Sequence, residues 1–328
     1  MQAEEAEKAG FDSLWYPDHV ITQGPDVVLE SFSTLSVLAG RTTRCMMGPM
    51  VVDPIRRHPA SIAHATITLD NISHGRAFLG IGAGEPMNLS PFGLKLEKPA
   101  TTLREAIILI KGLWSATKEN TFNFEGEIFK AEKASLGLTS IQKSGPPIYV
   151  GALGPKTREV TGEFADGWVP YVHTLSNYGK LVEEVKNGAK KTGRDPNKID
   201  IVANIPVLLL DRDDAQQRRE IRRRLAIRLI LETNTLKDLG WKEEIPRELC
   251  QSNMVVGPSI SKRLEEEADK IPMEIAEQIA AIGTPSQVIE KLESYRKLGA
   301  THFLIRLMGK DVKKNLKQFG SKVISRMN

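Results

Sequence analysis

The chain has 328 residues, of which 41% are hydrophobic and 26% charged, a composition that excludes a fibrous or disordered protein and suits one large α/β domain. Its net charge of +4 is too small to indicate a nucleic-acid partner, and no stretch approaches 18 consecutive apolar residues, so no membrane span is expected. Two distant cysteines, Cys45 and Cys250, predict neither a disulfide framework nor a metal site, and a reducing cytoplasm fits best.

Short apolar runs alternate with longer helical patterns along the chain, which predicts parallel strands joined by crossover helices. The seven expected strands cover residues 13–16, 44–50, 76–81, 147–151, 167–171, 200–210 and 301–307. Helices are expected over residues 29–39, 59–71, 101–115, 155–163, 175–192, 284–298 and 310–327. This alternation predicts that residues 1–328 form a single α/β domain, a (β/α)8 TIM barrel.

Seven strands are one fewer than a closed barrel requires, and the start of the chain suggests a reason. Residues 1–9 read as the end of a helix that Gly10 terminates, so the first strand of the barrel is expected to be missing from this chain. A start assigned too late would explain this, and so would a truncated chain. The former is favoured, because an open barrel exposes a strand edge.

Two insertions interrupt the alternation. Residues 121–130 read as a hairpin that turns at Gly126, and residues 231–272 as a long helical excursion before the last unit, which normally covers a site or builds an interface. Just before the excursion, six arginines recur at helical spacing: Arg218, Arg219, Arg222, Arg223, Arg224 and Arg228. A solvated helix face is the simplest interpretation, and a docking surface for an acidic cofactor tail or a partner subunit is the alternative.

Candidate functional residues come directly after the strands, because TIM-barrel sites lie at the carboxyl ends of the strands. Asp18 and His19 follow the first expected strand, where an imidazole can act as a base near neutral pH or bind a substrate oxygen. A purely local turn and packing role is the alternative. Arg57 and His58, after the second strand, are expected to cap a helix or form ion pairs.

The run from Gly80 to Asn88 ends a buried strand in a glycine-rich turn that carries one carboxylate, Glu85. Its glycines at positions 80, 82 and 84 let a ligand approach the backbone closely. A dinucleotide-binding fingerprint requires a helix directly after the glycines, whereas Glu85 and Pro86 follow here and no helical pattern is expected before about Thr101. A functional turn is therefore favoured over a nucleotide fingerprint or a structural turn.

A second glycine turn, from Gly151 to Gly154, leads into Pro155 at an expected helix start. Backbone N–H groups and the helix dipole at such a turn favour a phosphate group, and Lys156 adds positive charge. An ordinary strand-to-helix turn is the alternative.

Five segments in order resemble the bacterial luciferase-like superfamily over nearly the whole chain. They are Pro17-Asp18-His19, Arg57-His58-Pro59-Ala60, Leu69-Asp70 with Ser73 and Gly75-Arg76, Leu79 to Glu85, and Gly151 to Pro155. Within this superfamily the chain most resembles the branch that uses the deazaflavin coenzyme F420, especially methylenetetrahydromethanopterin reductase and its archaeal relatives. The resemblance implies a (β/α)8 barrel that binds F420 at its carboxyl rim, a hydride transfer between the deazaflavin C5 and a substrate carbon, and a homodimer or higher homo-oligomer.

The resemblance also implies which residues bind the coenzyme. Met50 and Val51 match the position of a non-prolyl cis peptide behind the deazaflavin ring, and Ala83, Gly84 and Glu85 match the loop over the ring edge. The phosphate turn matches Gly151, Ala152, Leu153, Gly154 and Pro155.

On the substrate side, Asp18 and His19 match the Asp-His pair of the family. His19, Glu85 and Asp18 are the expected catalytic group, in which His19 and Glu85 position the substrate and supply or accept a proton. His19 and Asn88 are expected to contact the substrate, and Asp18 and Glu85 also the coenzyme.

Two departures from the family pattern bear on the substrate, a small organic molecule. Sugar-phosphate and alcohol dehydrogenases of this group carry a Trp shortly after Asp-His, but Val20-Ile21-Thr22-Gln23 follows here, so neither substrate is supported. A tetrahydromethanopterin that carries a one-carbon unit is the best expectation, although Glu85 and Pro86 stand where methanopterin reductases are expected to have Asp-Lys. An FMN-dependent monooxygenase and a degenerate, non-catalytic barrel that acts as a binding module are the rival functions.

Overall fold

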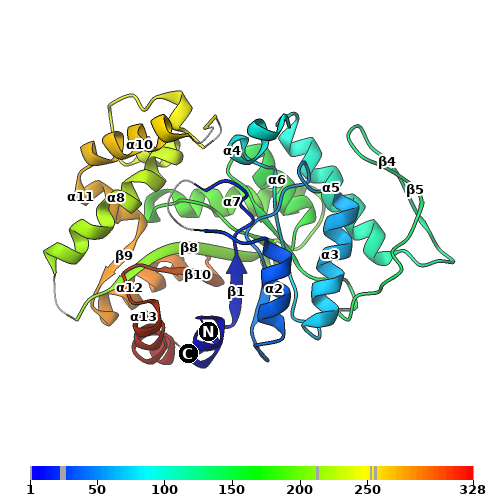
Figure 1. The fold of residues 1–328 in the computed structure, drawn as a ribbon, viewed down its shortest axis with the longest axis horizontal. Helices are drawn as coiled ribbons and strands as arrows, with labels where there is room; N and C mark the ends of the chain where they lie inside the picture. The colour runs from blue at the N-terminus through cyan, green and yellow to red at the C-terminus, as the bar shows by residue number, and fades with distance from the viewer. Residues whose placement is uncertain (1, 23–26, 212–213, 252, 255–256, 328) are drawn as a thin grey trace.

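The computed structural model describes residues 2–22, 27–211, 214–251, 253–254 and 257–327. Its centre is a curved arrangement of parallel strands (Figure 1). Each of the seven expected strands is present. They are β1 (Ser13–Tyr16), β2 (Met46–Pro49), β3 (Leu79–Gly82), β6 (Ile148–Gly151), β7 (Gly167–Trp168), β8 (Asp200–Leu209) and β10 (His302–Leu307). One further short strand, β9 (Ala281–Gly283), was not expected and pairs with the end of β8.

The strands follow the order of a TIM barrel. All of their ladders are parallel, with β1 beside β2 and the series β3-β6-β7-β8-β10 beyond. Two isolated parallel bridges, Met47 to Ala77 and Val52 to Ile81, join β2 to β3. The carboxyl ends of all these strands therefore meet at one rim, where the loops after β1, β2, β3 and β6 lie next to each other.

Helices cover the outer face of the strands. They are α1 (Gln2–Lys8), α2 (Ser31–Ala39), α3 (Pro59–Ile72), α5 (Pro99–Ser115), α6 (Pro155–Phe164), α7 (Leu175–Lys191), α12 (Pro285–Lys297) and α13 (Val312–Phe319). A further long helix, α8 (Ala215–Leu231), leads into the helical excursion. Proline begins α3, α5, α6 and α12, where its fixed φ suits the helix and its missing N–H costs nothing. The expected last helix is broken, because a π-helical turn, η5 (Gly320–Ile324), and α14 (Ser325–Met327) follow α13. Met1, expected at the start of the first helix, lies outside the described residues.

A groove lies between the first strand, β1, and the last strand, β10. Within the described ranges β1 and β10 form no ladder with each other, although Ser13 Oγ and His302 Nε2 are 3.0 Å apart across the gap. A groove of about 1100 Å³ separates the two strands, lined by apolar side chains of both and by α1 and α13. Figure 1 shows the two chain termini side by side at this opening.

Both insertions are present. The hairpin of β4 (Phe122–Glu125) and β5 (Lys130–Ala134) is longer than predicted, and it is held to α5 by the Glu105 carboxylate. This carboxylate accepts hydrogen bonds from the backbone N–H groups of Glu127, Ile128 and Phe129 at 2.8 to 3.0 Å. Burial raises the pKa of Glu105, but these hydrogen bonds outweigh it and lower the pKa below its usual value.

The helical excursion comprises α9 (Thr233–Asp238), η3 (Arg247–Leu249), α10 (Pro258–Lys270) and α11 (Met273–Ala276), followed by η4 (Glu277–Ile279). These segments gather with α8 at one end of the molecule, opposite the β4–β5 hairpin (Figure 1). The arginines of α8 pair mainly within this group, since Arg222 and Arg223 contact Asp269 at 2.8 and 2.7 Å. Much of the arginine run therefore joins α8 to α10. None of the described helices is long and apolar enough to span a membrane.

Candidate active site

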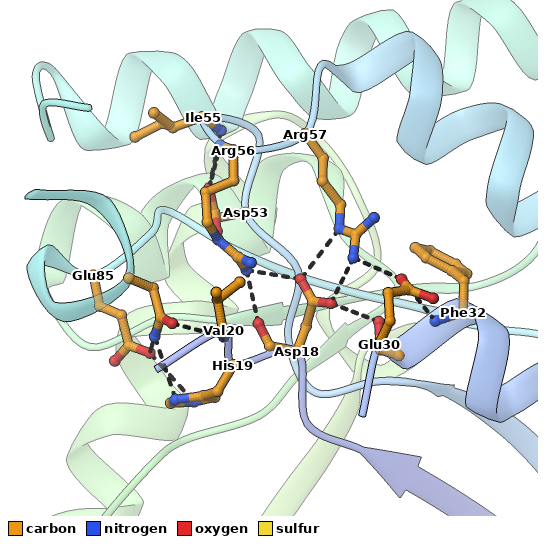
Figure 2. Close-up of polar contacts among 12 residues, drawn as sticks. Asp18, His19, Val20, Glu30, Phe32, Asp53, Ile55, Arg56, Arg57 and Glu85 are labelled. Atoms are coloured by element: carbon orange, nitrogen blue, oxygen red, sulfur yellow. Dashed lines mark hydrogen bonds and ion pairs between the residues drawn. The ribbon is translucent and has the colours of Figure 1, made fainter. Parts of the chain in front are cut away.

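The loops after β1 and β2 are joined by a buried ion-pair network around Asp18 (Figure 2). Arg56 Nη2 donates to Asp18 Oδ2 at 2.7 Å, and Arg57 Nη2 donates to Asp18 Oδ1 at 2.9 Å. Ser31 Oγ adds a hydrogen bond to Oδ1 at 2.7 Å. The Asp18 side chain is 3% exposed, so its carboxylate is saturated by protein donors. This geometry gives Asp18 the role of holding the loop on which His19 stands.

His19 reaches the carboxylate of Glu85 at the rim. His19 Nε2 lies 3.2 Å from Glu85 Oε1, and Asn88 Nδ2 lies 3.0 Å from the same oxygen and 3.3 Å from His19 Nδ1. Because both amide hydrogens of Asn88 are donated, His19 Nδ1 acts as an acceptor, which leaves the ring proton on Nε2 facing Glu85. The His19 and Glu85 side chains are 34% and 19% exposed, so a ligand can reach both.

Asn88 is tied to the protein through all of its polar atoms. Its Oδ1 accepts from the backbone N–H groups of Val20 and Ile21 at 2.8 and 2.9 Å, and the residue is 2% exposed. It lies on α4 (Pro86–Leu89), a one-turn helix directly after the glycine run. The prediction that no helix would form before about Thr101 was therefore wrong, because Pro86 supplies a helical first position.

The helical excursion contributes Gln251, which the sequence did not single out. Gln251 Nε2 donates to Glu85 Oε2 at 2.9 Å, so both oxygens of Glu85 have protein partners. The Gln251 Oε1 atom is buried and has no partner in the part of the chain that the structure describes. The excursion thus contacts the site through Gln251, whose second polar atom is a buried acceptor that is free for a ligand donor.

The peptide bond between Met50 and Val51 is cis, as the resemblance implied. The Val51 side chain lies inside the barrel between Gly82 and Gly151, where a side chain at position 82 would approach Val51 Cγ2 to 2.7 Å. A side chain at position 80 would clash with the carbonyl oxygen of Pro49. Gly80 and Gly82 therefore make room for the end of β2 rather than for a ligand directly, which corrects the sequence interpretation. Gly84 is needed for its φ of +95°.

The predicted phosphate turn lies between β6 and α6, next to the Val51 side chain. Thr157 Oγ1 accepts from the Gly154 N–H at 3.2 Å, and the Ala152 carbonyl accepts from Trp168 Nε1 at 3.2 Å. Arg158 donates to the Leu153 carbonyl and pairs with Glu184 at 2.7 Å. This turn is thus a stable strand-to-helix connection whose outer face stays open, since Leu153 is 43% exposed.

The structure brings His19, Glu85 and Asn88 into direct contact, with Asp18 at the base of the same loop. His58 caps α3 by accepting from the Ala60 N–H at 3.2 Å, which confirms its structural interpretation. Arg56 was not singled out in the sequence, although a second arginine beside Arg57 was a visible signal.

Comparison with known proteins gives the family. The family model of the luciferase-like monooxygenases matches residues 1–302, so the chain belongs to this family. The chain is 30% identical to 5,10-methylenetetrahydromethanopterin reductase of Archaeoglobus fulgidus, with 98% of this chain and 93% of that protein covered. It is also 30% identical to an F420-dependent glucose-6-phosphate dehydrogenase of Nakamurella multipartita, with 99% and 91% covered.

Two solved structures support the fold. An F420-dependent secondary alcohol dehydrogenase, in complex with an F420–acetone adduct, matches with a TM-score of 0.83 at 22% identity over 99% of this chain and 93% of that one. The coenzyme F420-dependent tetrahydromethanopterin reductase of Methanopyrus kandleri matches with a TM-score of 0.79 at 24% identity, covering 100% and 94%. The fold is therefore the TIM-barrel fold of these enzymes.

Replacing Asp18 tests the ion-pair network. Asp18→Asn removes the negative charge and leaves two partly buried guanidinium groups without it, so the free energy of unfolding is expected to fall by about 3 kcal/mol. Urea denaturation measures this. The control is Asp12→Asn, because Asp12 pairs with Arg44 at 2.8 Å but its side chain is 90% exposed, and its loss should cost less than about 1 kcal/mol. Equal losses in both variants would contradict the network's role.

Glu232, which precedes α9 near Arg158, gives a pH-dependent prediction. Burial raises the pKa of Glu232 from 4.5 to about 7, against the opposing charge of Arg158. The folded state therefore disfavours ionisation of Glu232, and the free energy of unfolding decreases as pH rises from 4.5 to 7. Glu232→Gln removes this loss and is expected to exceed the parent protein in stability by about 3 kcal/mol above pH 7 but not below pH 4.5.

Denaturation curves across this pH range measure the difference. Exposed Glu132, replaced by Gln, is the matched control and should follow the parent at every pH. A Glu232→Gln variant that also follows the parent would show that the carboxyl group is ionised in the folded protein at no cost.

Proposed function

We propose that the protein is an oxidoreductase that uses coenzyme F420. The observation that carries this proposal is the contact of His19 with Glu85, 3.2 Å apart at the carboxyl rim of the barrel, on the same rim as the cis peptide of Met50 and Val51. The relatives whose names include F420, or that act on methylenetetrahydromethanopterin, support it because they match over nearly the full chain.

The residues at the rim fit this coenzyme. A side chain at position 154 would meet only Thr157 Oγ1, at 3.9 Å, so a phosphate has space beside the N-terminus of α6. The unpartnered Gln251 Oε1 offers a buried acceptor to a ring N–H. When bound, F420 supplies or accepts a hydride at C5 of its deazaflavin ring. The turn from Gly151 to Pro155 would hold the phosphate, and Met50 and Val51, with Ala83 and Gly84, would contact the ring.

The chain's own part in the reaction is to orient the substrate and to move a proton. Loss or gain of a hydride at a substrate carbon changes the charge on the neighbouring heteroatom, and His19 Nε2–H or Glu85 supplies or takes the compensating proton there. Asn88 and Gln251 hold the Glu85 carboxylate in place through hydrogen bonds of 3.0 and 2.9 Å. Asp18 acts as a positioning residue for His19.

We further propose a tetrahydromethanopterin carrying a one-carbon unit as the substrate, which places the enzyme in one-carbon metabolism. The full-length match to the Archaeoglobus fulgidus reductase supports this choice. The sequence Val20-Ile21-Thr22-Gln23 follows Asp18 and His19, where the sugar-phosphate and alcohol dehydrogenases of the group carry a Trp. The backbone N–H groups of Val20 and Ile21 are bound to Asn88. This loop therefore offers no aromatic wall for a small alcohol or sugar.

Coenzyme binding decides between this function and its rivals. Titration of F420 into the purified protein, followed by deazaflavin fluorescence, is expected to give a micromolar dissociation constant. Tight binding of FMN instead, with oxidation of a substrate by reduced FMN and oxygen, would favour the monooxygenase. Binding of neither coenzyme would favour a non-catalytic barrel.

Replacing Glu85 tests the proposed proton transfer. Glu85→Gln keeps the shape of the side chain and one acceptor oxygen but removes the titrating group, so turnover should fall by about 100-fold while the affinity for F420 changes less than twofold. Turnover is measured with reduced F420 and methylenetetrahydromethanopterin. Glu97→Gln, on the exposed segment before α5, is the control. Unchanged turnover in Glu85→Gln would assign the residue a structural role.

A further inference from the structure

Two arginines from distant parts of the chain meet at the mouth of the barrel. Arg306 lies on β10, two positions after the inward-facing Leu304, so its side chain points to the same face, and Arg228 extends from α8. Arg306 Nε donates to Asn204 Oδ1 at 3.0 Å. Asn204 Nδ2 in turn shares the carbonyl oxygen of Tyr171 with Arg228 Nη2, at 3.1 and 2.9 Å. One asparagine thus connects both guanidinium groups, which we call the Arg228–Arg306 pair.

The Arg228–Arg306 pair is placed beside the proposed coenzyme and substrate site. Arg306 Nη2 lies 3.6 Å from the sulfur of Met50, the first residue of the cis peptide. The next residue, Val51, packs against Gly82, three positions before Glu85. Arg306 therefore lies on the same rim as Glu85, on the inner side of the strands.

The hydrogen-bonding capacity of the pair is largely unused. A guanidinium group carries five N–H donors. Arg76 donates to five oxygens of the protein, as expected for a structural arginine. In contrast, within the described part of the chain Arg306 has one oxygen and one sulfur partner, and Arg228 has one oxygen partner and the Tyr171 ring at 4.6 Å. The Nε atom of Arg228 is buried with no partner among the described residues.

The positive charge of the pair is also uncompensated. Arg56, the other inward-facing arginine of the rim, pairs with Asp53 and Asp18 at 2.6 and 2.7 Å. Across the described ranges no carboxylate pairs with Arg228 or Arg306. Burial first, and the charge of Arg228 second, lower the pKa of Arg306 to about 10, so Arg306 stays charged at neutral pH.

The His173 side chain, bound to the backbone of Asn204, does not offset these charges. His173 is buried, and its Nε2 accepts from the Asn204 N–H at 3.0 Å. Burial, followed by the charge of Arg228, lowers the pKa of His173 to about 3, so the ring is neutral near pH 7. Two like charges held together in a partly desolvated mouth are unfavourable unless an anion joins them.

We propose that the Arg228–Arg306 pair is a subsite that binds anionic oxygen atoms. Its first expected ligand is a carboxylate or phosphate group of the substrate. The planar donor fork of arginine suits bidentate contact with such oxygens. This inference rests on the proposed function for its biological ligand, but the subsite itself is defined by this chain's own residues. An anionic oxygen on the coenzyme ring is the second source of the same chemistry.

Inorganic phosphate and malonate serve as probes of the subsite. Calorimetric titration of the coenzyme-free protein, at constant ionic strength, is expected to show binding of at least one of them with a millimolar dissociation constant. Arg306→Gln and Arg228→Gln should each weaken it at least tenfold. Arg222→Gln, on the same α8 but paired with Asp269, is the matched control and should bind as the parent does. Absence of binding, or equal affinity in all four proteins, would overturn the proposal.

Arg306→Lys controls for a folding defect, because lysine keeps the positive charge but lacks the planar guanidinium group. It should bind the probe anion more weakly than the parent but more tightly than Arg306→Gln, with an unchanged circular dichroism spectrum. A purely structural role of Arg306 would lower stability in both variants without this graded loss of anion affinity.

Coenzyme titrations identify the source of the anion. If phosphate binds equally well with F420 present, and Arg306→Gln leaves F420 affinity unchanged, the anionic group belongs to the substrate. If phosphate and F420 compete and Arg306→Gln weakens F420, the group belongs to the coenzyme ring. Phosphate binding without any F420 binding would support the anion subsite and refute the proposed function. F420 binding without any anion binding would support the proposed function and refute the subsite.

Discussion

The buried carboxylate of Asp18 is the interaction on which the geometry of the rim depends. Arg56 and Arg57 lie on the loop after β2, and each pairs with the carboxylate of Asp18, which follows β1. Removing either partner would leave a charge in a site from which water is largely excluded, so the two loops move as one unit. Asn88 extends this unit to the loop after β3 through the backbone of Val20 and Ile21. The imidazole of His19 thus stands on a frame built from three strand ends.

Steric fit beneath this frame is equally restrictive. The Val51 side chain occupies the space that side chains at Gly82 and Gly151 would need, and the carbonyl of Pro49 occupies the space at Gly80. The end of β2 is therefore pushed toward the barrel axis, where Met50 meets Arg306. The glycine spacing of the strand that precedes Glu85 follows from this packing.

Local patterns predicted much of the fold but not its irregular parts. The strands were found because apolar runs bounded by Gly and Pro are a local signal, and the start of α6 because Pro155 follows glycine. The one-turn helix α4 and the short β9 were missed because each is too brief to show a period. The break after Phe319 was missed because the residues around Gly320 keep a helical pattern, while the close approach of Gly320 to the Ala9 carbonyl is a tertiary contact.

The sequence by itself determined the class of fold, the family and the loops that carry the site, because strand and helix periods and glycine turns depend on neighbouring residues. It also placed His19 and Glu85 on those loops. Only the tertiary structure decided which side chains meet there. Gln251 bonds to Glu85 across 166 positions of sequence, and Arg306 contacts Met50 across 256. Such pairs have no local period, and they form only when the crossover helices bring the ends of distant strands to one rim.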